Sequence, residues 1–136
     1  MLQRVGLFRE FYPDHVSLPW LRDRTGTRRI RSEAQIVGYL RAGHMVAGIM
    51  EWSTDVLDGT PFEEGSGAPS LLTDGTWLWR QDLAHYVERY HVELPDDFVL
   101  ALVESGFRMP DLSPQELAAL TAAEEEGLGS DWWGKP

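Results

Sequence analysis

The sequence predicts a single α+β domain, a small antiparallel sheet with a tryptophan-bearing hairpin, packed by three to four helices. Two observations lead to this prediction. The pair Asp74-Gly75 lies between apolar residues and is typical of a two-residue type I′ turn, whose central positions both need positive φ. At Arg80 the spacing of apolar residues then changes from two to about 3.6, which marks the passage from strand to helix.

The hairpin is expected over residues 70–79. A two-residue turn predicts the pairs Thr73 with Thr76, Leu72 with Trp77, Leu71 with Leu78 and Ser70 with Trp79. Leu72 and Trp77 then share one face, and the other face is apolar as well. Because both faces are apolar, we expect the hairpin to lie inside a sheet with helices over at least one side.

Two amphipathic helices are predicted after the hairpin, over residues 81–91 and 95–105. Apolar residues recur from Leu83 with the spacing of one helix face, which leaves Asp82 and His85 on the side expected to face water. Pro95 is typical of a helix start.

Three further elements complete the expected domain. Ser32 and Gln35 have the spacing of a capping box, which predicts a helix over 33–42 that Gly43 ends. Residues 45–52 are predicted to form a strand beside one arm of the hairpin. A second capping box, at Ser113 and Glu116, predicts a helix over 114–126 with little apolar surface to dock.

The domain is therefore expected to span residues 1–126, and residues 127–136 form a C-terminal tail with Trp132 and Trp133. Folding of this tail onto the domain is favoured over contact with a partner. Residues 5–12 fit either a short helix or an edge segment.

Composition excludes several classes of function. The 136 residues include no cysteine, which rules out disulfides, thiolate zinc sites and cysteine nucleophiles. No apolar run approaches a membrane span, and charges interrupt the N-terminus too early for a signal peptide. We expect a cytoplasmic protein that does not bind a membrane. Because no phosphate loop, metal motif or nucleophile elbow is present, no catalytic residue, metal or cofactor is predicted.

Charge is unevenly placed along the chain. Residues 1–50 hold eight arginines against four acids, and residues 51–136 hold four basic residues against eighteen acids. An acidic second half disfavours nucleic acid and favours a basic protein partner, although acids also serve solubility alone. The arginines of the turn-rich connector 14–31 are expected to pair with the acidic half, with phosphate contact as the alternative; they are Arg22, Arg24, Arg28, Arg29 and Arg31.

The long connection over residues 53–69 is the candidate binding element. Loops of this length are usually either binding elements or disordered. The predicted partner-binding residues are Trp52, Asp55, Asp58, Phe62, Glu63 and Glu64. Together they form an acidic finger suited to a basic groove, and a mobile solvated loop is the alternative.

Other side chains allow weaker chemical hypotheses. His85 and His91 project about 120° apart on a helix, so one metal ion is not easily held by both. Trp77 and Trp79 suit either a sugar-stacking platform beside acidic residues or a buried core, and the core is favoured for at least one of them.

A resemblance adds to these observations. The segments that carry it are Thr73-Asp74-Gly75-Thr76-Trp77-Leu78-Trp79-Arg80-Gln81-Asp82-Leu83-Ala84-His85-Tyr86-Val87, Leu94-Pro95-Asp96-Asp97-Phe98, Thr54-Asp55-Val56-Leu57-Asp58-Gly59 and Tyr39-Leu40-Arg41-Ala42-Gly43. Over roughly residues 33–110 the chain resembles a group of small actinobacterial proteins that look like immunity-type partners of secreted polymorphic toxins. The resemblance implies a toxin-binding role and supplies no catalytic residue.

The preferred hypothesis is therefore a non-enzymatic protein-binding module that neutralises a cognate toxin through an acidic surface. A small hydrolase or carbohydrate-binding protein that uses acids beside Trp77 and Trp79 is one alternative. A regulatory or oligomerisation domain is the other, and the sequence leaves the oligomeric state open.

Overall fold

The structure is a computed structural model that describes residues 2–128, with side chains as far as residue 124. Its elements are β1 (Gln3–Arg4), the short 3-10 helix η1 (Leu21–Arg24), α1 (Glu33–Arg41), β2 (His44–Ala47), β3 (Leu71–Thr73), β4 (Trp77–Arg80), α2 (Leu83–Tyr90), α3 (Asp96–Glu104) and α4 (Pro114–Leu128). This arrangement confirms the predicted α+β class.

The sheet has the order β1-β4-β3-β2. The predicted antiparallel pairs are present, since β3 lies between β2 and β4 and runs opposite to both. Strand β1 was not predicted, and it pairs in parallel with β4, so the sheet is mixed. Strand β2 ends at Ala47 rather than at Trp52, where its partner β3 begins with Leu71, and a bulge interrupts the pairing between Met45 and Ala47.

The hairpin turn differs from the prediction. Thr73 pairs with Leu78, so the turn is two residues longer than a type I′ turn allows. The cause is Asp74, whose Oδ1 accepts hydrogen bonds from the backbone N–H groups of Thr76 and Trp77. Within the turn only Gly75 has a positive φ. Because the register moves by two residues, every side chain keeps its predicted face.

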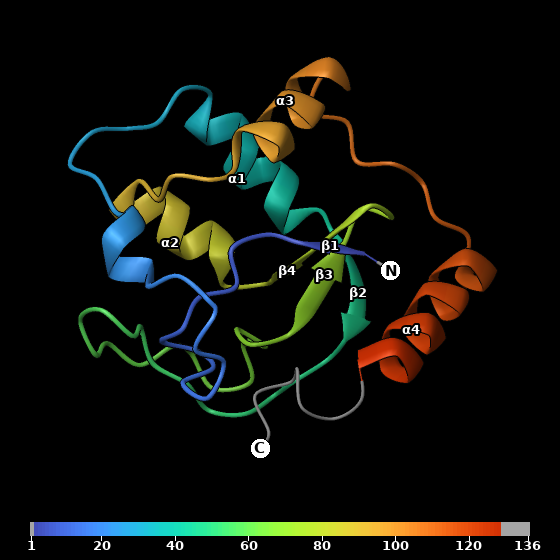
Figure 1. Ribbon diagram of the computed structural model, residues 1–136, viewed down its shortest axis with the longest axis horizontal. Coiled ribbons are helices and arrows are strands. Elements are labelled where there is room, and N and C mark those ends of the chain that lie inside the picture. Colours follow the sequence, from blue (N-terminus) through green and yellow to red (C-terminus); the bar gives the residue numbers. More distant parts are fainter. Residues whose placement is uncertain (1, 129–136) are drawn as a thin grey trace.

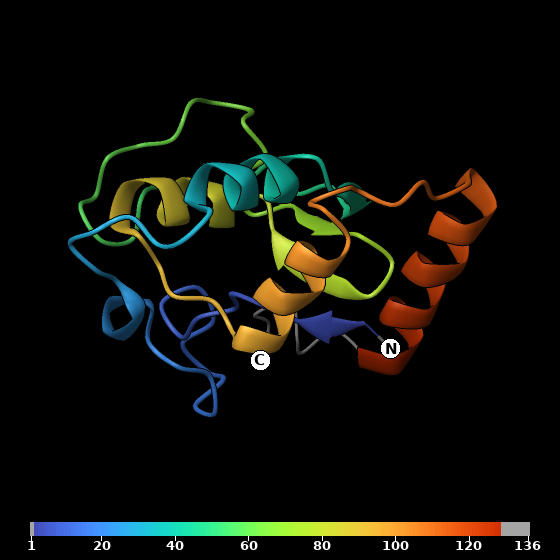
Figure 2. The ribbon, with the colours of Figure 1, turned by 90° about the horizontal axis from the view of Figure 1, so that it is seen from above.

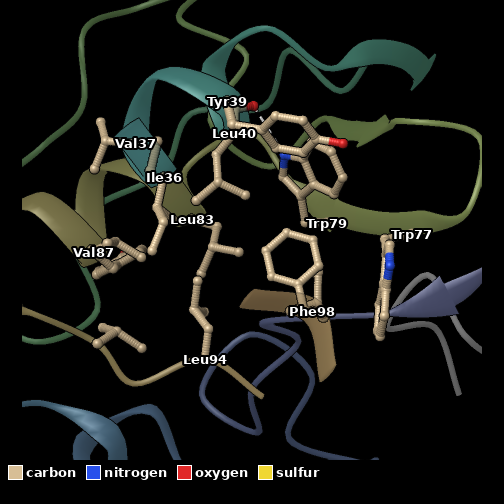
Figure 3. Packing of buried hydrophobic residues seen from close by; sticks show 14 of the residues in the cluster. Ile36, Val37, Tyr39, Leu40, Trp77, Trp79, Leu83, Val87, Leu94 and Phe98 are labelled. Atoms are coloured by element: carbon tan, nitrogen blue, oxygen red, sulfur yellow. Dashed lines mark hydrogen bonds between the residues drawn. The ribbon is translucent and has the colours of Figure 1, made fainter. Parts of the chain in front are cut away.

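Helices α1, α2 and α3 gather on one side of the sheet, and α4 lies apart from them beside β2 (Figures 1 and 2). Trp79, fully buried, lies in the core on the side of the three helices, with its ring about 6.0 Å from the rings of Tyr39 and Phe98 (Figure 3). Its Nε1 donates a hydrogen bond to the Leu40 carbonyl oxygen. A Cβ on Gly43 would lie 2.8 Å from this indole, so close packing requires glycine there.

The opposite face of the sheet is covered by the N-terminal segment and by α4, which contributes Leu117 and Leu120. The capping box of this helix is confirmed, because Ser113 and Glu116 exchange hydrogen bonds. Glu124 adds a polar attachment that was not predicted. It is 1% exposed and accepts hydrogen bonds from the Leu2 N–H and from Arg4.

Two local predictions were wrong. Ser32 adopts a left-handed conformation and makes no side-chain cap, while the neighbouring Glu33 accepts a hydrogen bond from the Ile30 N–H. Asp82 is buried rather than solvated, because it forms an ion pair of 2.8 Å with Arg80. The expected domain end at 126 falls inside α4, and residues 129–136, with Trp132 and Trp133, lie outside the described part of the chain.

Candidate functional site

The first half of the connection between β2 and β3 is folded. Residues 53–62, here called the acidic loop, form a small hairpin-like turn that lies beside α2 (green in Figure 1). Thr54 and Pro61 form an isolated bridge, and the Phe62 N–H donates to the Ser53 carbonyl oxygen at 3.0 Å. The Asp55 N–H donates to the Thr60 carbonyl oxygen at 2.8 Å. The backbone of the loop is therefore fixed by its own hydrogen bonds.

Asp55 occupies the centre of this loop and is 1% exposed. Its Oδ1 accepts hydrogen bonds from the backbone N–H groups of Leu57 and Asp58, at 2.8 and 3.2 Å. Its Oδ2 lies 2.7 Å from Nε2 of His85 and accepts a hydrogen bond of 2.9 Å from the Tyr90 hydroxyl. A carboxylate with four such partners stabilises the conformation of the loop. Asp55 therefore does not belong to an accessible acidic surface.

The electrostatics of Asp55 agree with this role. Burial opposes ionisation of the carboxyl, but the hydrogen bonds from His85, Leu57, Tyr90 and Asp58 outweigh it, so the pKa of Asp55 lies below its ordinary value. Burial and the neighbouring Asp55 together raise the pKa of Tyr90 to about 12. The carboxylate is therefore ionised and the phenol neutral at pH 7.

Helix α2 holds the loop through further contacts. The Tyr86 hydroxyl accepts a hydrogen bond from the Val56 N–H at 3.0 Å, and Arg89 forms an ion pair of 2.6 Å with Asp58. The Phe62 ring packs edge-on against His85, with 4.9 Å between ring centroids. Asp58 and Phe62, both predicted to contact a partner, thus also serve to dock the loop.

Asp58 stays exposed around its ion pair, and the other three predicted residues face solvent as well. Trp52 is 68% exposed, and Glu63 and Glu64 are exposed as well. Trp52 and Glu63 directly flank the hydrogen-bonded residues Ser53 and Phe62, at the open end of the loop. With the exposed neighbours Met50 and Glu51 they form what we call the Trp52 surface: Met50, Glu51, Trp52, Glu63 and Glu64.

A buried aspartate that orients a half-exposed histidine is also part of many hydrolase sites. Such a site needs a nucleophile within hydrogen-bond reach of the imidazole. Among the residues that the structure describes, no hydroxyl side chain other than that of Tyr90 reaches this cluster, and Tyr90 bonds Asp55. Nor does the described part of the chain contain three His, Asp or Glu side chains grouped to hold a metal ion.

The tryptophans of the hairpin do not form a sugar platform. Trp77 is 7% exposed and Trp79 is fully buried, and both rings contact Phe98. Neither ring presents a face to a carbohydrate, so the alternative that placed acids beside these two residues loses its basis.

A cleft of about 600 Å³ lies in another part of the molecule, away from the acidic loop. Its walls are apolar side chains of the N-terminal segment and of the connection between α2 and α3. Arg4, Arg24, Glu93 and Asp96 line it as well, so it carries charges of both signs. Sequence reasoning missed it because its walls come from segments about ninety residues apart, and no motif marks either one.

Comparisons with known proteins add no identification. No family model matches the chain, and no curated protein or solved structure shows significant similarity to it. Within residues 2–128, no helix combines the length and the apolar character that a membrane crossing requires.

Proposed function

We propose that the chain is a non-enzymatic protein-binding module of the immunity type, which neutralises a cognate toxin by covering a basic surface of that toxin. The observation that carries the proposal is the exposure of Trp52 at the open end of a loop whose backbone is fixed by Asp55. The toxin as partner and the cytoplasm as location rest on the family resemblance and on the sequence, and belong to the same proposal.

An exposed tryptophan on a fixed frame is suited to protein recognition. Tryptophan is enriched among the residues that carry most of the binding free energy at interfaces. Because the acidic loop is already folded, binding does not have to pay for ordering it. Leu100, another large exposed side chain, lies on α3 outside this loop and serves as a matched comparison.

The negative charge of the Trp52 surface favours a partner with a positively charged surface. Glu51, Glu63 and Glu64 are exposed and lie on a chain of net charge −10. Their field accelerates encounter with a basic protein, and an arginine or lysine of that protein can stack on the Trp52 indole. Of the predicted acids, Glu63 and Glu64 are exposed without an ion pair within the described residues, so they are the ones we expect to act most directly on the partner.

The test is a calorimetric titration of the purified protein with the product of the neighbouring gene. Trp52→Ala should weaken binding by about tenfold or more, whereas Leu100→Ala should change it less than about twofold. Charge reversal at Glu63 and Glu64 should slow association more than it speeds dissociation, and Glu104→Lys, at an exposed acid of α3, controls for net charge.

Two results would contradict the proposal. One is the absence of binding at micromolar concentration, and the other is equal loss of affinity for Trp52→Ala and Leu100→Ala. Circular dichroism of each variant separates a lost contact from a lost fold.

A further inference from the structure

A second charged surface lies on the other side of α2. Residues 22–31, here called the basic segment, carry five arginines and one acid, Asp23, so their formal charge is +4 within a chain of net charge −10. Every residue of the segment is exposed except Ile30, which is half-buried. The segment (blue) and the acidic loop (green) lie on different sides of α2 in both ribbon views (Figures 1 and 2).

The backbone of the basic segment is attached to the domain at several points. The Arg22 N–H donates to Oε2 of Glu10 at 3.0 Å, and the Glu93 N–H donates to the Arg24 carbonyl oxygen at 2.8 Å. Further along, the Gly26 N–H donates to the Tyr90 carbonyl oxygen at 2.9 Å. The exposed arginines therefore project from a fixed chain.

The expected pairing of these arginines with the acidic half of the chain is wrong. Arg22 forms a pair of 3.6 Å with Glu10 and stacks on the Trp20 ring, and Arg29 approaches Glu33 at 3.9 Å. Both acids belong to the first fifty residues.

Three arginines have no such contact. The side chains of Arg24, Arg28 and Arg31 form no ion pair and no hydrogen bond within the described residues. The acids nearest to them in the chain or in backbone contact are Asp23, Glu33 and Glu93, and none of these pairs with any of the three arginines. The protein has 22 acids, yet none of them pairs with these three arginines within the described residues. Their guanidinium groups are therefore available to bind a ligand.

We propose that the basic segment is a docking surface for a carboxylate-rich segment of a partner protein, with Arg24, Arg28 and Arg31 as the contacting residues. The guanidinium group is planar and offers paired N–H donors, a geometry that matches a carboxylate in a bidentate hydrogen bond. This surface is separate from the Trp52 surface. It binds negatively charged groups, whereas the Trp52 surface binds positively charged ones.

The size of the patch favours a short acidic peptide over a nucleic acid. Charges in water are screened beyond about 8–10 Å at physiological salt, so a short ligand on the segment experiences mainly its arginines. A nucleic acid continues past the segment and meets the field of a protein whose other residues carry a net charge of about −14.

The test uses fluorescence anisotropy of the full chain with a dye-labelled oligoglutamate peptide, and with a single-stranded oligonucleotide of the same formal charge. Replacement of Arg24, Arg28 and Arg31 together by glutamine should weaken peptide binding by about tenfold or more, because each loses a charge-assisted hydrogen bond. Arg108→Gln is the matched control, since Arg108 is an exposed arginine outside the segment. It should change the affinity less than about twofold.

Three results would overturn the proposal: no peptide binding by the native protein, equal binding by the triple variant, or tighter binding of the oligonucleotide than of the peptide. Thermal unfolding of the triple variant verifies that it remains folded. Charge reversal at Glu63 and Glu64 should not weaken peptide binding, so failure of this proposal is distinguishable from failure of the Trp52 surface.

Discussion

The acidic loop and the basic segment lie on different sides of α2. The charged groups of the first bond to neighbouring residues, whereas several of those of the second face solvent. In the acidic loop, Asp55 is buried and Asp58 is paired with Arg89, so these charges fold the loop. In the basic segment, Arg28 and Arg31 have no partner within the described residues, so these charges face solvent. Charge counted along a sequence therefore does not tell which groups are available to a partner until the internal hydrogen bonds are known.

Tyr90 connects the two regions. Its hydroxyl donates to Oδ2 of Asp55, and its carbonyl oxygen accepts the Gly26 N–H of the basic segment. The acidic loop is thus attached to the domain through the buried carboxylate of Asp55. The basic segment is attached through backbone hydrogen bonds and through Glu33. Substitutions that remove one attachment at a time test this difference.

The largest loss is expected from Asp55→Ala. The change removes the acceptor of two backbone N–H groups and of the Tyr90 hydroxyl, and leaves these partly buried groups without that partner. We expect the free energy of unfolding to fall by about 2–4 kcal/mol in urea denaturation. Glu63→Ala, on the exposed part of the same connection, should change it by less than about 0.5 kcal/mol. A loss below about 1 kcal/mol for Asp55→Ala would mean that the carboxylate does not hold the loop.

Acid should produce the same loss reversibly. The pKa of Asp55 is lowered in the folded state, so its stabilising contribution is complete above the pKa of the unfolded chain and is lost as pH falls through the folded value. The unfolding free energy of the native protein should therefore decrease below about pH 4. Asp55→Asn should show a shallower decrease over the same range, and parallel profiles for the two proteins would contradict this assignment.

Glu33→Ala tests the attachment of the basic segment. Glu33 is 7% exposed, accepts the Ile30 N–H at 3.3 Å and lies 2.6 Å from Nδ1 of His91. We expect a loss of about 1–3 kcal/mol, smaller than that of Asp55→Ala because fewer buried donors are left unpaired. If Glu33→Ala lowered the free energy of unfolding more than Asp55→Ala in the same urea measurement, the attachment of the basic segment would be the stronger of the two.

Tyr90→Phe removes a single hydrogen bond to Asp55 and keeps the ring. The expected loss is about 1 kcal/mol. In the background of Asp55→Ala the same change should have a smaller effect, because the acceptor is already absent and only the interaction of the hydroxyl with Arg89 remains. Equal losses in both backgrounds would show that the hydroxyl acts through a different contact.

The smallest effect is expected at the surface of the basic segment. Arg28→Ala and Arg31→Ala should each change the unfolding free energy by less than about 0.5 kcal/mol, because both side chains are exposed and form no ion pair or hydrogen bond within the described residues. A loss above about 1 kcal/mol at either position would show an internal partner and would remove that arginine from the proposed docking surface.

Patterns that depend on local period were predictable from the sequence. The two faces of the hairpin, the apolar stripes of α2 and α3 and the capping box at Ser113 follow from spacing alone. The register of the hairpin was not predictable in the same way, because the side chain of Asp74 competes with the two-residue turn for the backbone N–H groups.

Features that depend on contacts between distant residues were missed. Asp82 is polar at a position that a helix projection places in water, and only its pairing with Arg80 explains its burial. Asp55 was predicted to contact a partner, and its buried role in the loop could not be inferred without knowing that His85 and Tyr90 lie against the loop. Trp52, Glu63, Glu64 and Asp58 are the predicted site residues that the structure leaves exposed, and Asp58 is paired with Arg89.

The hydrogen bond between Leu2 and Glu124 joins residues 122 positions apart. Strand β1 also pairs with β4, which follows more than seventy residues later. The N-terminal strand is thus held by two attachments that close very long stretches of chain, one to β4 and one to α4. Contacts of such long sequence separation slow folding, because the chain between the two partners must be closed into a loop before they form.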